Sequence, residues 1–127
     1  MKPIILPWPS KDLSPNARVH WAKKALAASK AREDGRLAAI ASGWHNHKFG
    51  EGRIYLLFEF YPPTRRGIDD DNAIARCKNA RDGIADAIGA NDRKFVCIPY
   101  VHDETRKGGE VVVSLLDELC RQNLVKR

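Results

Sequence analysis

Three consecutive aspartates and an asparagine, Asp69-Asp70-Asp71-Asn72, are the residues whose type and spacing point most directly to chemistry. One explanation is structural, because Asp and Asn side chains cap helix N-termini and favour the positive end of the helix dipole. One cap needs only one aspartate, however, and neighbouring carboxylates repel one another unless a cation neutralises them. If the run is extended, Asp69 and Asp71 lie on one side and Asp70 on the other. Two carboxylates on one side suit Mg²⁺ or Mn²⁺ rather than zinc, so the run is a candidate metal site.

Lys78, Asp82 and Asp92 form a second group of candidates further along the chain. On one continuous helix, Asp71, Lys78 and Asp82 fall within a stripe of about 40°. An i,i+4 pair such as Lys78 and Asp82 is usually surface support, whereas beside a carboxylate pair the lysine can stabilise developing negative charge. We expect Asp92 to return to the same end of the sheet as a third carboxylate. Arg81 falls on the apolar side of this helix, and the helical pattern gives no reason for it.

The elements that must position these residues follow from hydrophobic periodicity and turn signals. Strands are predicted at Ile4 to Trp8, Arg53 to Tyr61, Phe95 to Val101 and Val111 to Leu116, and helices from Ser14-Pro15 to Ser42-Gly43 and from Asn72 to Ile88. The order β-α-β-α-β-β predicts an α/β (α+β) fold, in which two main helices cover a small mixed sheet. The length fits one domain over residues 1–127. The order of the strands in the sheet is not determined by this pattern.

The two predicted helices have recognisable ends and faces. Ser14 is the expected N-cap of the first helix, with Pro15 as its first residue, and Gly89 closes the second. The apolar stripe of the first helix is expected to face the core, and comprises Val19, Ala22, Leu26, Leu37 and Ile40. On the second helix, Cys77 falls on the apolar face, as a small core residue does. The tail from Leu119 to Arg127 is either a short helix or a frayed end.

Composition excludes several classes of protein. The net charge of +6 and the pI near 9.4 fit a polyanion partner such as nucleic acid. No stretch approaches ~18 consecutive apolar residues, and prolines interrupt the N-terminal apolar run, so neither a membrane span nor a signal peptide is expected. The three cysteines, Cys77, Cys97 and Cys120, form no C-x-x-C pair. A disulfide framework or a zinc cage is therefore not expected, and a reducing cytoplasm is the predicted location.

The histidines and tryptophans have simpler interpretations. His45 and His47 are the most closely spaced histidines, and they lie in a predicted polar loop where no metal role is expected. The three tryptophans are expected to pack in the core or at a sheet edge rather than to stack on bases: Trp8, Trp21 and Trp44.

The N-terminal segment Leu6-Pro7-Trp8-Pro9-Ser10 and the acidic motif together resemble the RusA-type Holliday-junction endodeoxyribonucleases. The motif comprises, in order, Arg65-Arg66, Asp69-x-Asp71-Asn72, Lys78-x-x-x-Asp82, Gly89 and Asn91-Asp92, and the similarity spans most of the chain. The resemblance implies a homodimeric nuclease with a RusA-like fold that nicks four-way DNA junctions symmetrically, in recombination and repair, with Mg²⁺ or Mn²⁺. Carried over residue by residue, it implies Asp69, Asp71 and Asp92 as the metal-binding carboxylates and Lys78 as the essential lysine.

DNA contacts and assembly follow from this interpretation. Basic side chains would hold backbone phosphates and contribute most of the affinity. The candidates are Lys23, Lys30, Arg65, Arg66, Arg93 and Lys94. Two incisions related by two-fold symmetry call for a dimer, and the edges of strands such as Val111 to Leu116 need covering.

The chain departs from the RusA pattern at two positions. In the RusA pattern the essential lysine usually comes one helical turn sooner, at the position where this chain has Ala75. Lys78 is the preferred candidate for this role, and Arg76 is the weaker alternative. Asn91 stands where an acid is common. A shift of one residue would also exchange the roles of Asp69 and Asp70. Two other functions stay open: a junction-binding module that does not cleave, and a Mg²⁺-dependent nuclease acting on RNA or simple duplex.

Overall fold

The central strand of the sheet, β2 (Ile54–Tyr61), follows from the alternation of side chains in this segment. In the computed structural model, which describes residues 1–116, every second residue from Ile54 to Phe60 is buried. The side chains between them lie on the other face of the strand, as a period of two requires. The predicted strand is confirmed.

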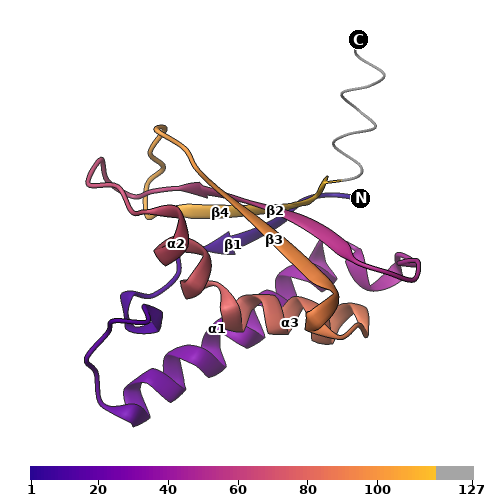
Figure 1. The fold of residues 1–127 in the computed structure, drawn as a ribbon, viewed down its shortest axis with the longest axis horizontal. Helices are drawn as coiled ribbons and strands as arrows, with labels where there is room; N and C mark the ends of the chain where they lie inside the picture. The colour runs from indigo at the N-terminus through magenta and orange to yellow at the C-terminus, as the bar shows by residue number, and fades with distance from the viewer. Residues whose placement is uncertain (117–127) are drawn as a thin grey trace.

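The chain folds into a four-stranded mixed sheet with three helices (Figure 1). The other elements are β1 (Ile4–Pro7), α1 (Trp21–Ala41), α2 (Asp70–Arg76), α3 (Lys78–Ile88), β3 (Phe95–Val101) and β4 (Glu110–Leu115), with short 3₁₀ turns at Lys11–Leu13, Trp44–Asn46 and Asp92–Lys94. The predicted fold class is confirmed, and so is the order of strands and helices, apart from the division of the second helix into two.

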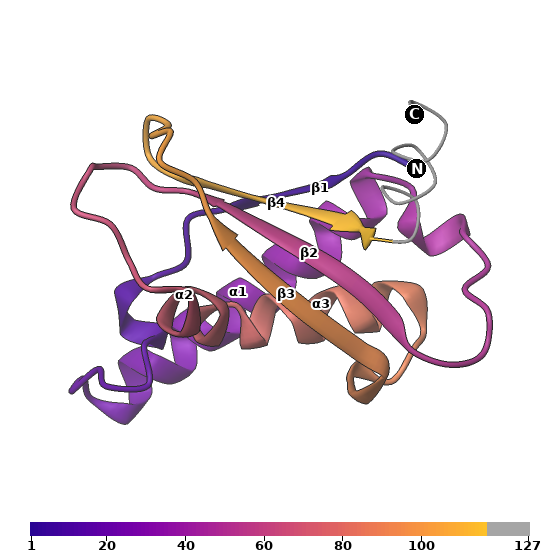
Figure 2. The same cartoon turned by 45° about the horizontal axis from the view of Figure 1, so that its top comes forward.

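The strand order in the sheet is β1-β4-β2-β3 (Figure 2). Strand β4 pairs antiparallel with both β1 and β2, whereas β2 and β3 are parallel. Helices α2 and α3 form the crossover that a parallel pair needs. The edges of the sheet are therefore β1 and β3. The expectation that the strand near Val111 has an edge to cover is wrong, because β4 lies between two partners.

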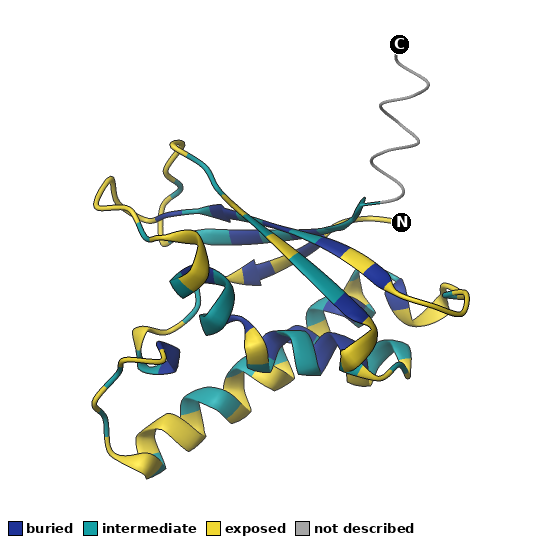
Figure 3. Cartoon of the chain, in the orientation of Figure 1, coloured by how far each residue is buried: buried dark blue, intermediate teal, exposed yellow. Residues whose placement is uncertain are grey.

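All three helices lie on one side of the sheet, where the buried residues concentrate (Figures 1 and 3). Helices α1 and α3 approach so closely that two positions on their contact tolerate no side chain. A Cβ atom on Gly83 would overlap the carbonyl oxygen of Arg32 and lie 2.8 Å from the amide nitrogen of Arg36. A Cβ atom on Gly35 would overlap the carbonyl oxygen of Ala80. Glycine is therefore required for this backbone contact.

Helix α1 begins later than the sequence predicts. Its N-cap is His20, whose Nδ1 accepts a hydrogen bond from the amide of Ala22 at 3.2 Å. Ser14 is instead buried and donates its hydroxyl to Asn72, so it does not cap α1. The predicted end is confirmed, since α1 stops at Ala41 and Gly43 follows in a left-handed conformation with φ of 81°.

The predicted apolar face of α1 is wrong for its two leucines. Leu26 is 73% exposed and Leu37 is 50% exposed, whereas the buried positions of α1 are Gly35 and Ala39. The reason is the close backbone approach to α3, which selects small residues at the contact and leaves the long apolar side chains outside it.

The helix predicted from Asn72 to Ile88 is two helices. Helix α2 ends at Arg76, α3 begins at Lys78, and Cys77 between them has φ of −92° and ψ of 5°. Cys77 is buried, as predicted, and burial raises the pKa of its thiol to about 12. Gly89 closes α3 in a left-handed conformation, which confirms the predicted cap.

The three tryptophans have different environments. Trp44 is buried and donates its indole N–H to the carbonyl oxygen of Lys2 at 2.7 Å, and Trp8 is half-buried with its ring edge-on to Phe60. Both confirm the packing prediction, whereas Trp21 is 77% exposed and contradicts it. The predictions for Cys120 and for the tail after Leu119 lie outside the described residues. No helix within residues 1–116 has the length and apolar character needed to cross a membrane.

Candidate functional site

Helix α2 begins at the acidic run, and Asp69 is its N-cap. The Oδ1 atom of Asp69 accepts a hydrogen bond from the amide of Asn72 at 2.7 Å. Asp70 and Asp71 occupy the first turn of α2, where the helix dipole favours carboxylates. Both side chains are exposed, and neither makes a hydrogen bond or ion pair within residues 1–116. Capping therefore explains Asp69, and it leaves Asp70 and Asp71 without a protein partner.

The helical start of α2 also changes the geometry of the run. Only Asp69 has an extended conformation, with φ of −75° and ψ of 155°. Because Asp70 and Asp71 are helical, they lie about 100° apart around the axis rather than on opposite sides of a strand. The alternation expected for an extended run therefore does not hold.

Asn72 connects the acidic run to the N-terminal segment. Its Oδ1 atom accepts hydrogen bonds from Ser14 Oγ at 3.3 Å and from Arg76 Nε at 3.1 Å. Trp8 and Arg76 line the same cavity of about 260 Å³. The two stretches that carry the resemblance therefore meet in space. Arg76 is engaged in this network, which argues against it as the cation that serves a bound phosphate.

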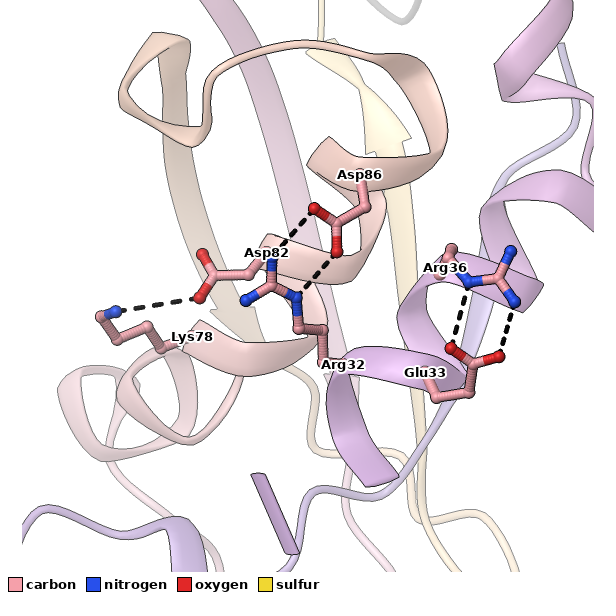
Figure 4. A network of polar contacts seen from close by, with 6 residues as sticks. All are labelled: Arg32, Glu33, Arg36, Lys78, Asp82 and Asp86. Atoms are coloured by element: carbon pink, nitrogen blue, oxygen red, sulfur yellow. Dashed lines mark hydrogen bonds and ion pairs between the residues drawn. The ribbon is translucent and has the colours of Figure 1, made fainter. Parts of the chain in front are cut away.

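Lys78 is the first residue of α3 and lies beside Asp82. Its Nζ atom is 3.8 Å from Asp82 Oδ2, and the lysine side chain is 67% exposed (Figure 4). Since Cys77 separates α2 from α3, Lys78 and Asp71 are not on one helix, and the stripe predicted for a continuous helix does not apply. The i,i+4 pairing of Lys78 with Asp82 is as expected. Asp82 keeps its Oδ1 atom buried without a hydrogen-bond partner in the described chain.

Asp92 lies apart from the acidic run. It directly precedes β3 at the end of the sheet where β2 begins, whereas the acidic run follows the end of β2 (Figure 2). The expected return of Asp92 to the same end of the sheet is therefore wrong. Its Oδ2 atom is 3.9 Å from Nη2 of Arg81. Arg81, on the inner side of α3, therefore has Asp92 as a partner. Burial raises the pKa of the Cys97 thiol on β3, and the Arg81 guanidinium opposes that rise.

The part of the chain that the structure describes contains no group of three or more His, Cys, Asp or Glu side chains placed to hold a metal ion. The three carboxylates implied by the resemblance are accordingly not gathered in one described chain: Asp69 and Asp71 lie at the start of α2, and Asp92 pairs with Arg81.

Ion pairs hold α1 against α3. Arg32 on α1 binds both carboxylate oxygens of Asp86 on α3, with Nε–Oδ2 at 2.7 Å and Nη2–Oδ1 at 2.9 Å (Figure 4). The hydrogen bonds from Arg32 lower the pKa of the Asp86 carboxyl and raise the pKa of the guanidinium. Within α1, Arg36 binds Glu33 in the same two-pronged way. Several cations of α1 therefore have protein partners.

The predicted DNA-binding cations divide into two sets. Lys30 lies 2.8 Å from Asp34 and Lys23 lies 3.8 Å from Asp12, so both have a carboxylate neighbour. The other four are exposed, and their side chains form no ion pair or hydrogen bond among residues 1–116: Arg65, Arg66, Arg93 and Lys94. The second set is available to contact phosphates without breaking an existing pair.

A further polar cluster, which no pattern in the sequence marks, lies where β2 and β3 end. Glu59 Oε2 is 2.8 Å from His102 Nε2 and accepts a hydrogen bond from the Tyr61 hydroxyl at 3.3 Å. The His102 ring stacks on Tyr61 with centroids 4.3 Å apart, and the guanidinium carbon of Arg106 lies 3.5 Å from the same tyrosine centroid. We call these four residues the Glu59–His102 cluster. The register of β2 with β3 brings Glu59 and His102 together, and a backbone hydrogen bond from the Arg106 amide to the Pro62 carbonyl oxygen holds the loop that carries Arg106.

Comparison with known proteins shows one informative relationship. The chain is 51% identical over 116 residues to an uncharacterized protein of Xylella fastidiosa strain Temecula1, which covers 91% of this chain and 76% of the relative. The chain belongs to the family of that Xylella protein. No family model matches the chain.

This member of the Xylella protein's family thus presents two kinds of charged site. Unpaired carboxylates at the start of α2 follow a loop with unpaired arginines, which suits a cation together with an anion. Paired carboxylates on and after α3 are neutralised by the protein itself. Only the first kind leaves charges for a ligand to satisfy.

Proposed function

We propose that the protein is a Mg²⁺-dependent endodeoxyribonuclease that nicks four-way DNA junctions. The observation that carries this proposal is the exposed pair Asp70 and Asp71, which lacks a partner in the described chain and follows a loop that bears unpaired Arg65 and Arg66. Carboxylates suit a hard metal ion, and unpaired arginines suit the phosphates of a polyanion. The resemblance to the RusA-type endonucleases and the net charge of +6 support the same function.

The donor chemistry of the acidic run fits Mg²⁺. This ion is usually held by one or two carboxylates and retains several waters, so it does not need a complete protein cage. Asp69 uses Oδ1 as the helix cap and retains Oδ2, and Asp71 retains both oxygens. We propose Asp69 and Asp71 as the ligands, as the resemblance implies, with Asp70, which is equally exposed and unpaired in the described chain, as the alternative to Asp69. When bound, Mg²⁺ lowers the pKa of a bound water and neutralises the scissile phosphate.

The remaining roles fall to cations of this chain. Lys78 has a long, exposed side chain two residues beyond the end of α2, and in the proposed site it stabilises charge on the phosphate. Arg65, Arg66, Arg93 and Lys94 contact backbone phosphates and supply most of the affinity. Lys23 and Lys30 contribute less, because each must leave a carboxylate neighbour to do so.

Junction binding without cleavage is the second candidate function. The observation that favours it is the pairing of Asp92 with Arg81, which leaves the acidic run without a third carboxylate within residues 1–116. A binding module would need the unpaired cations and would not need the acids.

Assembly and location complete the proposal. Two symmetric nicks call for two sites related by a two-fold axis, so we propose a homodimer. Static light scattering at micromolar concentration should then give about twice the chain mass of 14.3 kDa. A monomer in the presence of junction DNA would exclude symmetric resolution. Cys77 and Cys97 are both free thiols, which suits the reducing cytoplasm that we propose as the location.

The test is a nicking assay on matched substrates. The full-length protein is incubated with a four-way junction, a duplex, a single strand and an RNA duplex, each with Mg²⁺ and with EDTA. The proposed function predicts paired nicks in the junction only, and only with Mg²⁺. Tight junction binding with no nicks in Mg²⁺ or Mn²⁺ would show that the protein is the binding module instead. Faster cleavage of RNA or of simple duplex than of the junction would identify that nucleic acid as the substrate.

A further inference from the structure

A groove of about 570 Å³ lies between the loop after β2 and the loop after β3. Thr64 and Arg65 line one side, and His102, Asp103 and Thr105 line the other. Hydroxyls, a guanidinium and an imidazole are groups that bind backbone phosphates. Ile68 also lines the groove and directly precedes the acidic run in sequence.

His102 is held in this groove with one nitrogen engaged and the other without a partner. Its Nε2 atom lies 2.8 Å from Glu59 Oε2, and stacking on Tyr61 fixes the plane of the ring. The Nδ1 atom, on the other side of the ring, has no hydrogen-bond partner in the described part of the chain. A carboxylate at Nε2 fixes a proton there, so protonation of the ring adds a donor at Nδ1.

The charges around His102 come from several elements. Glu59 on β2 contacts Nε2, and Asp103 and Arg65 line the same groove. Arg106 lies over the Tyr61 ring and is itself paired with Glu104 and with Glu110 on β4. Tyr61 and Tyr100 contact the ring faces and edge. Burial raises the pKa of the Tyr61 phenol, so that ring stays neutral at physiological pH. The contact between Glu59 Oε2 and His102 Nε2, at 2.8 Å, is the shortest of these interactions.

We propose that His102, oriented by Glu59, binds a backbone phosphate of the DNA in the groove together with Arg65. The imidazolium donates from Nδ1 to a phosphate oxygen, while Nε2 donates to Glu59. Glu59 is a positioning residue and does not touch the DNA. The inference rests on the proposed function for the identity of the ligand, since the groove chemistry alone specifies a phosphodiester.

One consequence is that the number of phosphates that the protein contacts depends on pH. The slope of log affinity against log salt concentration reports how many phosphates the protein neutralises, at about −0.9 for each on duplex DNA. The protonated ring adds one such contact and the neutral ring does not. The slope should therefore be steeper at pH 6 than at pH 8, by at most about 0.9, the value for one phosphate contact.

The experiment is fluorescence anisotropy with a labelled four-way junction in EDTA, over a salt series at pH 6 and pH 8. Wild type should show the difference in slope, and His102→Gln should give equal slopes at the two pH values. His45→Gln is the matched control, because His45 is exposed and its side chain makes no hydrogen bond, ion pair or ring contact within residues 1–116, and it should keep the wild-type difference. Glu59→Gln should retain the fold and reduce the difference in slope, because the ring loses the carboxylate that orients it.

Several outcomes overturn the inference. One is a wild-type protein with the same slope at both pH values, and another is a His102→Gln variant that keeps the difference. A His102-dependent slope for an RNA duplex but not for the junction would overturn the assignment to DNA. Because EDTA prevents cleavage, these results are separate from the nicking assay: pH-linked junction binding without nicking would refute the nuclease and leave the His102 contact standing.

Discussion

The aspartates of α2 and those of α3 have opposite environments, although the two helices are consecutive. Asp86 is bound by Arg32 through two hydrogen bonds, and Asp82 and Asp92 have Lys78 and Arg81 as neighbours. Asp70 and Asp71 have no such partner in the described chain. The acids on and after α3 are therefore paired within the protein, and Asp86 joins α3 to α1, whereas those of α2 carry charge that the described chain leaves unneutralised.

Unneutralised charge of this kind has a cost and a partial compensation. Neighbouring carboxylates repel one another, which raises the free energy of the folded chain unless a cation binds. The dipole of α2 offsets part of this repulsion, at about 0.3–1 kcal/mol for an exposed carboxylate in the first turn. The comparison predicts that substitutions in the two groups have separable effects: loss of activity at α2 and loss of stability at the contact of α1 with α3.

The largest effect is expected for Asp71→Asn. Removing this proposed metal ligand should lower the nicking rate at least about a hundredfold, which is roughly 2.7 kcal/mol of barrier. Junction binding should stay equal or become tighter, because a negative charge near phosphate is lost. Single-turnover nicking and gel-shift assays on the same preparation measure both quantities.

Neighbouring variants calibrate that result. Asp69→Asn should behave like Asp71→Asn, and Asp70→Asn should retain more activity; the reverse ranking would assign Asp70 as the ligand. Glu51→Gln, an exposed acid in a loop, is the control and should cut at the wild-type rate. If Asp71→Asn also cuts at the wild-type rate, the acidic run is only a helix start.

On the stability side, the largest effect is expected for Gly83→Ala. The added methyl group would overlap the Arg32 carbonyl oxygen, so α1 and α3 must move apart. We expect a loss of about 2–3 kcal/mol in the free energy of unfolding, as for an overpacked core position. Urea unfolding followed by circular dichroism measures it. Gly50→Ala meets no atom within 4 Å and is the control; equal stability losses for both variants would remove the close contact as the cause.

The fold was predictable in the segments where the periodicity of apolar residues matches the residues that are buried. The alternation in β2 and the left-handed glycines after α1 and α3 gave correct elements because one local rule decides each of them. The face of α1 was not predictable from apolar periodicity. Its contact with α3 is made by backbone against backbone, and Gly35 and Gly83 carry no hydropathy signal that marks such a contact. The start of α1 was missed because the Ser14 hydroxyl bonds Asn72, which is 58 residues away.

The sequence selects the residues of the candidate site and does not give their geometry. Composition singles out the acidic run, in which Asp70 and Asp71 are exposed and unpaired within residues 1–116. The positions of Lys78 and Asp92 relative to the run depended on the break at Cys77 and on the parallel register of β2 with β3. The Glu59–His102 cluster depends on the same register, so neither placement follows from local sequence.

Substitution of Lys78 tests whether a residue that pairs with an acid of α3, but has a proposed role beside the acids of α2, affects activity or stability. It lies beside Asp82 at 3.8 Å, yet the proposed role is at the phosphate. Lys78→Ala should lower the nicking rate at least about tenfold, roughly 1.4 kcal/mol of barrier, with little change in stability because the pair is exposed. Arg76→Ala should weaken DNA binding modestly at most. Single-turnover rates that fall for Arg76→Ala and hold for Lys78→Ala would reverse this assignment.

The smallest effect is expected for Asp86→Asn. It breaks the Arg32 pair between α1 and α3, and because both side chains are exposed, the loss of thermal stability at pH 7 should be smaller than that of Gly83→Ala. Nicking should be unchanged, unlike Asp71→Asn. The sign of the pH dependence follows from the pKa of Asp86, which the Arg32 hydrogen bonds lower from its ordinary value of 3.8.

A carboxyl with a lowered pKa in the folded state stabilises above its unfolded pKa, and this stabilisation is lost as pH falls through the folded value. The difference in melting temperature between wild type and Asp86→Asn should therefore be constant near neutral pH and shrink below about pH 4. Thermal unfolding followed by circular dichroism at pH 7, 4 and 3 measures the trend, with Glu51→Gln as the exposed control. A variant that kept its melting temperature but lost nicking would place Asp86 with the acids of α2, and would end the division between the two groups.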